Sequence, residues 1–294
     1  MFYKIKVGFL VSYDYKFLYN SIPLVYDYVD TIYLAIDVNR KTWSGELFTI
    51  DILFFNFITK LDKHKKIIIY EDDFYNSELT PIENDTRERN MLSKKIGKNC
   101  WNLQIDADEY FMDFAQVSRF LRKNSFLLSK PNHNPINLKA KWITIFKKTE
   151  NGYLYIDNDE SFSFATNQIE KYYFARNVNP SIRNLQTNFI ALHQSWARDS
   201  EEILFKINNW GHKYDFDRKA YFKFWKNLNE DNYKDCNSFH YYLDDAWDSL
   251  KYIACGDISE FIEIFKSKVI TDDVKVPTRF YKKYLKNLFL LKRN

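Results

Sequence analysis

The chain has 294 residues, a formal net charge of +4 and a mean hydropathy of −0.49. With 46% hydrophobic residues and only 6 Gly and 6 Pro, it has the composition of a folded globular protein and not of a disordered or fibrous one. Its 43 basic and 39 acidic residues are too nearly balanced for a nucleic-acid-binding protein, so we expect no nucleic-acid partner.

The cysteines and the apolar runs indicate where the protein works. Cys100, Cys236 and Cys255 are odd in number and lack C-x-x-C spacing, which argues against a disulfide framework and against a zinc knuckle. No apolar run approaches the roughly 18 residues of a membrane-spanning helix, and the run near the N-terminus is too short for a secretion signal. A cytoplasmic location is therefore expected.

The first part of the chain alternates between strand-like and helix-like segments. Apolar patterns predict strands at 4–11, 31–36, 66–70 and 101–105, and helices at 17–29, at 48–61 and from a cap at Thr86 onward. Such alternation is typical of an α/β fold with a mostly parallel central sheet covered by helices. Ligands of these sheets bind at the carboxyl ends of the strands, which here carry Asp14, Asp37, Glu71 and Asp106.

The second part of the chain is less regular. Its patterns predict a hairpin from strands at 138–147 and 153–156, a strand at 189–196 and a helix at 200–211. The remainder is rich in aromatic residues and mainly helical in pattern. We therefore expect one main domain over residues 1–214 and a helical C-terminal extension over residues 215–294 that packs on it.

The clearest chemistry lies in the stretch W-N-L-Q-I-D-A-D-E-Y at 101–110. Its apolar alternation predicts a buried strand, and Asp106 and Asp108 follow at the end of that strand. Two residues that are two positions apart share a face of an extended chain, so these acids can hold Mg²⁺ or Mn²⁺ together with a ligand's phosphates. Since an empty site of this kind would concentrate negative charge, replacing Asp108 should not destabilise the metal-free protein. A solvated acidic turn is the alternative.

Three further motifs stand in order around this stretch: T-R-E-R-N at 86–90, L-H-Q-S-W at 192–196 and K-I-N-N-W-G-H at 206–212. The ordered set resembles the family 2 glycosyltransferases of the GT-A fold over roughly residues 4–215. Its downstream part is also similar to the related enzymes that add N-acetylglucosamine to glycoprotein cores. The resemblance implies a Rossmann-like catalytic domain that transfers a sugar, with inversion, from a UDP-sugar to a glycan or a lipid-linked acceptor in the synthesis of a surface or secreted glycan.

The resemblance also implies roles for individual residues. Asp108 and His193 would bind Mn²⁺ or Mg²⁺, although a histidine on an apolar strand can equally be a core residue. The residues expected to contact the nucleotide sugar are Ser12, Asp14, Asp37, Arg89 and Asp106. The chain departs from the family where its first strand ends in V-S-Y-D and its second in A-I-D-V-N, without the usual N-E-x and D-G-S.

An inverting transfer needs a general base that takes the proton of the acceptor hydroxyl. The loop D-N-D-E-S-F-S-F at 157–164 carries several acids, for which we expect no nearby basic partner. We expect Glu160 or Asp157 to be this base, with Asp159 in the same loop and Asp199 further along as alternatives.

Two other functions remain open from the sequence. A D-x-D phosphohydrolase also has two aspartates after a strand, but that motif has Thr or Val where Tyr110 stands, and it belongs to the first strand of its fold. A non-catalytic module that binds nucleotide or carbohydrate is the second alternative. Residues 279–294 interleave Lys and Arg with Phe, Tyr and Leu, which is typical of interfacial helices and predicts a peripheral membrane contact; a closing helix packed on the domain is the alternative.

Overall fold

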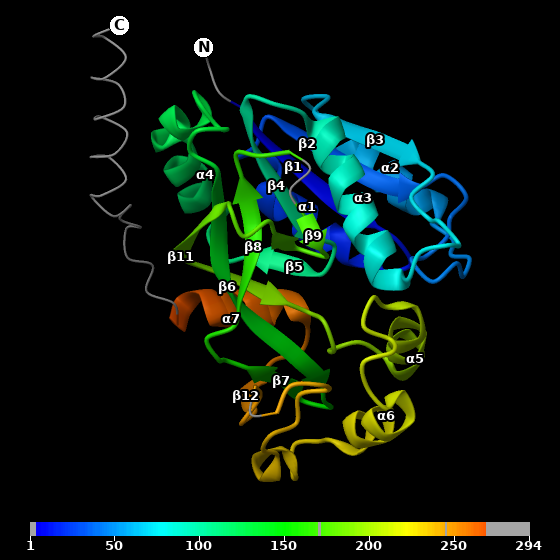
Figure 1. The fold of residues 1–294 in the computed structure, drawn as a ribbon. Coiled ribbons are helices and arrows are strands. Elements are labelled where there is room, and N and C mark those ends of the chain that lie inside the picture. The colour runs from blue at the N-terminus through cyan, green and yellow to red at the C-terminus, as the bar shows by residue number, and fades with distance from the viewer. Residues whose placement is uncertain (1–3, 170–171, 245, 269–294) are drawn as a thin grey trace, which may run out of the picture.

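The computed structural model describes residues 4–169, 172–244 and 246–268. Figure 1 shows a central sheet with helices on both of its faces. The strands of this sheet are β1 (Lys4–Val11), β2 (Thr31–Asp37), β3 (Ile67–Asp72), β4 (Cys100–Asp106), β5 (Glu109–Phe111), β6 (Ile136–Lys148), β7 (Gly152–Ile156), β8 (Ser161–Thr166), β11 (Arg183–His193) and β12 (Lys251–Ala254). A separate small sheet consists of β9 (Tyr172–Phe174) and β10 (Asn177–Val178).

The helices lie between and after these strands. They are α1 (Leu18–Tyr26), α2 (Ile52–Leu61), α3 (Pro81–Ile96), α4 (Phe114–Lys123), α5 (Ser200–Asn209), α6 (Arg218–Asn227) and α7 (Ile258–Lys268), with short 3₁₀ helices at Tyr15–Phe17, Ser125–Leu128 and Tyr233–Asp235. In the described ranges, no helix combines the length and the apolar character needed to cross a bilayer. The segment 279–294, for which a membrane contact is expected, lies outside the described residues.

The expected α/β class with a parallel sheet is confirmed. Strands β3, β2, β1 and β4 are neighbours in that order, and every pair among them is parallel. Beyond β4 the sheet continues through β8, β6, β7 and β12 in antiparallel pairs, and β11 runs parallel to β6. The change of pattern follows the connections, because helices link the first four strands whereas a tight turn joins β6 to β7.

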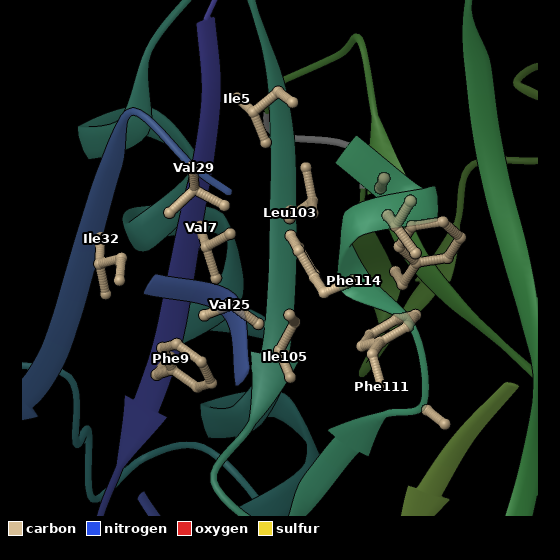
Figure 2. Close-up of a cluster of buried hydrophobic side chains, with 14 of the residues drawn as sticks. Ile5, Val7, Phe9, Val25, Val29, Ile32, Leu103, Ile105, Phe111 and Phe114 are labelled. Carbon is tan, nitrogen blue, oxygen red and sulfur yellow. The ribbon is translucent and has the colours of Figure 1, made fainter. Parts of the chain in front are cut away.

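Strand β1 shows why both faces of the parallel strands are covered. Ile5, Val7 and Phe9 belong to the cluster on one face, where Figure 2 shows Val7 and Phe9 near Val25 at the end of α1. Gly8 points to the other face, against α3. A Cβ atom added to Gly8 would lie 2.6 Å from the Leu92 side chain, so glycine allows the close approach of this helix.

The C-terminal part differs from the expected helical extension. Lys251–Ala254 forms the edge strand β12, which pairs with β7, and the described residues between Asp235 and Lys251 form bends and irregular segments. A hydrophobic cluster joins this part to the main sheet: Phe146, Leu154, Ile156, Trp196, Ile203, Ile207, Trp225, Leu228, Phe239, Trp247 and Leu250. The described part of the extension therefore contains two α-helices, α6 and α7, and in addition a strand and irregular segments whose aromatic residues pack into this cluster.

Candidate active site

A cavity of about 310 Å³ opens where β1 and β4 end. Leu10 is the partner of Asp106 in the parallel register, so the residues that follow β1 meet the D-x-D turn that follows β4. The residues expected in the site that line this cavity are Ser12, Asp14, Arg89, Asp106, Asp108, Glu160 and His193. Asp37 and Asp157 are not among its lining residues.

Asp108 and His193 come together although they lie far apart in the chain. Strand β5 pairs with β11 so that Glu109 is opposite His193, which brings the preceding residue, Asp108, beside the imidazole. The Oδ1 atom of Asp108 lies 3.6 Å from Nε2 of His193, and its Oδ2 atom accepts a 2.6 Å hydrogen bond from Arg198. Burial opposes ionisation, but His193 and Arg198 hold the pKa of Asp108 well below its usual range.

His193 has the protonation state that a metal ligand needs. Its ring stacks on Trp142 with centroids 4.7 Å apart, and its side chain is 17% exposed. Burial lowers the pKa of His193 to about 4 even though Asp108 opposes this shift. The imidazole is therefore neutral near neutral pH and has a lone pair available for a cation.

The donor atoms of Asp108 and His193 fit a divalent ion. Their separation of 3.6 Å is too long for a hydrogen bond and suits two ligands of one cation. Mn²⁺ accepts mixed carboxylate and imidazole ligation, whereas Mg²⁺ prefers oxygen ligands alone. Among the residues that the structure describes, no three His, Cys, Asp or Glu side chains gather as a metal site, so the remaining ligands would be substrate oxygens and water.

Asp106 is held by two arginines, one of which was expected. Arg89 donates from Nη2 to both oxygens of Asp106, at 3.1 and 3.2 Å, and from Nε to Asp85 at 2.6 Å. Arg176 also pairs with Asp106 at 2.9 Å. Burial opposes the shift, but Arg176 and Arg89 lower the pKa of Asp106, which keeps this carboxylate ionised.

The helix that carries Arg89 begins earlier than the sequence suggested. Thr80 is its N-cap and donates its backbone N–H to Glu83 at 2.8 Å, with Pro81 as the first helical residue. Thr86, expected as the cap, lies inside the helix and donates its hydroxyl to the carbonyl of Ile82. Arg89 is therefore rigidly placed in the helix interior and not in its opening turn.

Arg176 and Arg198 were missed by sequence reasoning. Arg176 follows β9 and makes two bonds to Glu109, at 2.6 and 2.8 Å; nothing in the local sequence marks it. Arg198 lies two residues after the motif that contains His193, and besides Asp108 it contacts Asp14 at 3.4 Å. Three buried N–H groups of the site arginines have no hydrogen-bond partner in the described part of the chain: Arg89 Nη1, Arg176 Nε and Arg198 Nε.

Asp37 has a different role from the expected contact with a nucleotide. Its carboxylate accepts hydrogen bonds from the backbone N–H groups of Asn39, Lys41, Phe74 and Tyr75, all at 3.0 to 3.1 Å. These bonds tie the loop after β2 to the loop after β3. Asp37 is buried and occupied by the protein itself, so the expectation that it binds the base or ribose is corrected.

The structure separates the two expected bases, Glu160 and Asp157. Asp157 pairs with Lys141 at 2.9 Å and Lys251 at 2.7 Å, which lower its pKa against the opposing effect of burial; the expectation that it has no basic partner was wrong. Glu160 lines the cavity, accepts a 3.3 Å hydrogen bond from the indole of Trp247, and has its pKa raised by burial.

The remaining alternatives for the base lie elsewhere. Asp199 is the N-cap of α5 and accepts a 2.8 Å hydrogen bond from the backbone of Glu202. Asp159 is fully exposed in the loop after β7. Neither is among the residues that line the cavity.

Comparison with known proteins adds little to this geometry. No family model and no curated protein matches the chain. Among solved structures, the chain is similar to a crystal structure of S. aureus TarS 1-349, with 14% sequence identity and a TM-score of 0.32. The match covers 50% of this chain and 41% of that chain, so it carries no functional assignment.

Proposed function

We propose that this protein is a metal-dependent glycosyltransferase that moves a sugar from a nucleotide sugar, a UDP-sugar by our expectation, to a saccharide or lipid-linked acceptor. The observation that carries the proposal is the meeting of Asp108 and His193 at 3.6 Å, in the same cavity as Asp106 and Glu160. These are the residues that a sugar transfer with a diphosphate leaving group requires: acids and an imidazole for a metal, and a separate base.

The cationic side chains around Asp108 support the departure of a diphosphate. Mn²⁺ or Mg²⁺ held by Asp108 and His193 would neutralise the negative charge that develops on the leaving group. Arg198 supplies fixed positive charge in the same cavity. Lys206 is buried there and donates to the carbonyl of Ser195 at 2.7 Å, and burial lowers its pKa to about 7, so it adds positive charge when protonated. A charge that is already oriented before substrate binds favours an ionic transition state.

Glu160 supports the proposed inversion. A carboxylate whose pKa is raised by burial is a stronger base than an exposed one, and the side-chain donors of Glu160 are neutral groups, the indole of Trp247 and the amide of Asn158. It would accept the proton of the acceptor hydroxyl as that oxygen attacks the sugar. Asp106, fixed by its arginines, would contact the ribose or the sugar of the donor.

The alternatives are less well supported. The phosphohydrolase class has its aspartates on the first strand of the fold, whereas here they follow β4. A non-catalytic binding module would have no use for an acid such as Glu160 that lacks a cationic partner among the described residues. The cytoplasmic location and the membrane contact through residues 279–294 remain predictions of the same proposal.

Nucleotide release separates these functions. Purified full-length protein is incubated with UDP-glucose, UDP-galactose and UDP-N-acetylglucosamine in the presence of Mn²⁺, and release of UDP is measured. We expect release with at least one donor and its loss in EDTA, with recovery on adding Mn²⁺. A phosphohydrolase would release phosphate from phosphate esters and leave these donors intact, and a binding module would bind UDP without turnover.

A further inference from the structure

A second part of the cavity is lined by aromatic side chains that follow α5. We call them the aromatic wall: Trp210, His212, Tyr241, Tyr242 and Trp247. They come from the two segments before and after α6, far in sequence from the D-x-D turn. No residue of the wall was expected to bind a ligand.

The wall is held in place by contacts that leave one ring uncovered. His212 is fixed by a 2.6 Å bond from Nδ1 to Asp215 and stacks on Tyr242, with centroids 5.5 Å apart and an angle of 16°. The backbone N–H groups of Tyr242 and Leu243 both donate to Nδ1 of His240, at 3.2 and 3.1 Å. Tyr242 nevertheless remains 45% exposed. An aromatic ring that is anchored but uncovered has a face free for a ligand.

The wall leads to the expected base. Tyr242 contacts Tyr241 with centroids 4.7 Å apart, and Tyr241 contacts Trp247 at 5.8 Å. The indole N–H of Trp247 donates to Oε2 of Glu160 at 3.3 Å. A ligand that lies on these rings is therefore directed toward Glu160.

Charge beside the wall selects among ligands. Glu160 also lines a neighbouring cavity of about 600 Å³, together with Asp157, Asp159 and Asp248. The described residues that line this second cavity include neither Lys nor Arg, but Asp157 is paired with Lys141 and Lys251, so the negative charge there comes from Glu160, Asp159 and Asp248. Negative charge of this kind repels a phosphate and leaves a neutral molecule unaffected.

We propose that the aromatic wall is the acceptor subsite and that it takes the neutral end of a saccharide, one hydroxyl of which meets Glu160. A pyranose ring has an apolar C–H face that packs on an aromatic ring and a polar rim that bonds to acids, and this chain offers both. The identification as an acceptor site rests on the proposed transfer of sugar. The uncompensated acids around Glu160 disfavour a saccharide phosphorylated at this end.

Direct binding tests the subsite without any need for a donor. Full-length protein is applied to an array of neutral oligosaccharides and of the same oligosaccharides bearing phosphate, and calorimetry with UDP and Mn²⁺ is run in parallel. The variants are Tyr242→Ala and Tyr242→Phe, with Tyr214→Ala as the matched control. Tyr214 is 72% exposed and does not line the cavity.

We expect the parent protein, Tyr242→Phe and Tyr214→Ala to bind neutral saccharides, and Tyr242→Ala to lose about 10-fold or more in affinity, since the stacking face is gone. The affinity for UDP should be the same in all four proteins. Absence of neutral saccharide binding, preference for the phosphorylated set, or full binding by Tyr242→Ala overturns the proposal. Saccharide binding without nucleotide binding would support the saccharide site and contradict the proposed transferase. Nucleotide binding without saccharide binding would support the donor site and contradict the saccharide subsite.

Discussion

The D-x-D turn and the part of the cavity beside the aromatic wall differ in whether their acids have cationic partners. Both aspartates of the D-x-D turn have a cation: Asp106 pairs with Arg176, and Asp108 pairs with Arg198. Beside the aromatic wall, Glu160 has no cationic partner among the described residues, and its side-chain donors are the neutral groups of Trp247 and Asn158. The two aspartates are therefore held ionised before a ligand binds, whereas Glu160 is an acid able to accept a proton.

This comparison corrects one expectation about stability. We expected that replacing Asp108 would relieve repulsion in an empty acidic site and leave stability unchanged. Asp108 does not lie in such a site. Its carboxylate is buried and bonded to Arg198 at 2.6 Å, so its removal leaves a buried guanidinium with only the longer contact to Asp14. Removing one partner of a buried pair destabilises the folded state.

The largest expected effect falls on turnover at the metal pair. Asp108→Asn and His193→Ala should each lower kcat by about 10³-fold or more, because either change misplaces the cation. The double variant should be little worse than either single one, since the two ligands act as a unit. Turnover and Mn²⁺ affinity are measured with saturating donor, and Tyr214→Ala, at an exposed residue outside the cavity, serves as control.

His193→Ala gives the sharpest test of this pair. If that variant keeps the Mn²⁺ affinity of the parent, His193 is a core residue and the metal belongs to the carboxylates alone. Unchanged turnover in both single variants would show that Asp108 and His193 do not hold a metal that turnover requires.

The next largest effect concerns Glu160, which has no cationic partner among the described residues. Glu160→Gln should lower kcat by about 10²- to 10³-fold with donor affinity retained, because the amide cannot accept a proton. The base acts in its ionised form and its pKa is raised by burial, so kcat of the parent should fall with decreasing pH already above the usual range of a glutamate. That acidic limb should be absent from the residual activity of the variant. Full activity in Glu160→Gln would move the base elsewhere.

A third effect is on the free energy of unfolding, which should differ between a variant at the D-x-D turn and a variant at Glu160. Arg198→Met removes the partner of Asp108 and should lower the free energy of unfolding by about 3–5 kcal/mol. Glu160→Gln should cost nothing near neutral pH, because a carboxyl group whose pKa is raised on folding destabilises the folded state once it ionises. Urea unfolding without nucleotide measures both. Equal losses of unfolding free energy in Arg198→Met and Glu160→Gln would contradict the view that Asp108 is compensated by a cation and Glu160 is not.

The sequence predicted the parts of this molecule that depend on local pattern. The apolar runs located β1, β2 and β4, and two of the acids at the strand ends, Asp14 and Asp106, line the cavity, because parallel strands bring their carboxyl ends to one edge. Asp37 and Glu71 do not line it. The structure brings Asp108 and His193, named from a resemblance, to 3.6 Å, and their metal binding remains a prediction. A helix start was misplaced because the stronger cap, Thr80 followed by Pro81, lies one and a half turns before Thr86.

The partners of individual side chains could not be predicted from the sequence. The loop after β7 carries acids and no base, yet the lysines that hold Asp157 come from β6 and β12, one of them far along the chain. Arg176 reaches Asp106 only because the small sheet of β9 and β10 places it there. Such contacts are tertiary, and no periodicity or local motif encodes them.

The smallest expected effect belongs to Asp157. It lies in the same loop as Glu160, but unlike Glu160 it does not line the donor cavity. Asp157→Asn should leave kcat within about twofold of the parent, because the carboxylate does not line the donor cavity. Its two lysine pairs are partly exposed, and such pairs contribute about 0.2–1 kcal/mol each, so the loss of stability should be of that size. The pKa of Asp157 is lowered on folding, so this contribution is present near neutral pH and disappears as the pH falls through that lowered value. Urea unfolding of parent and variant at neutral and acidic pH should therefore give a small difference that vanishes in acid. A loss of turnover like that of Glu160→Gln would instead show that the two acids share the work of the base.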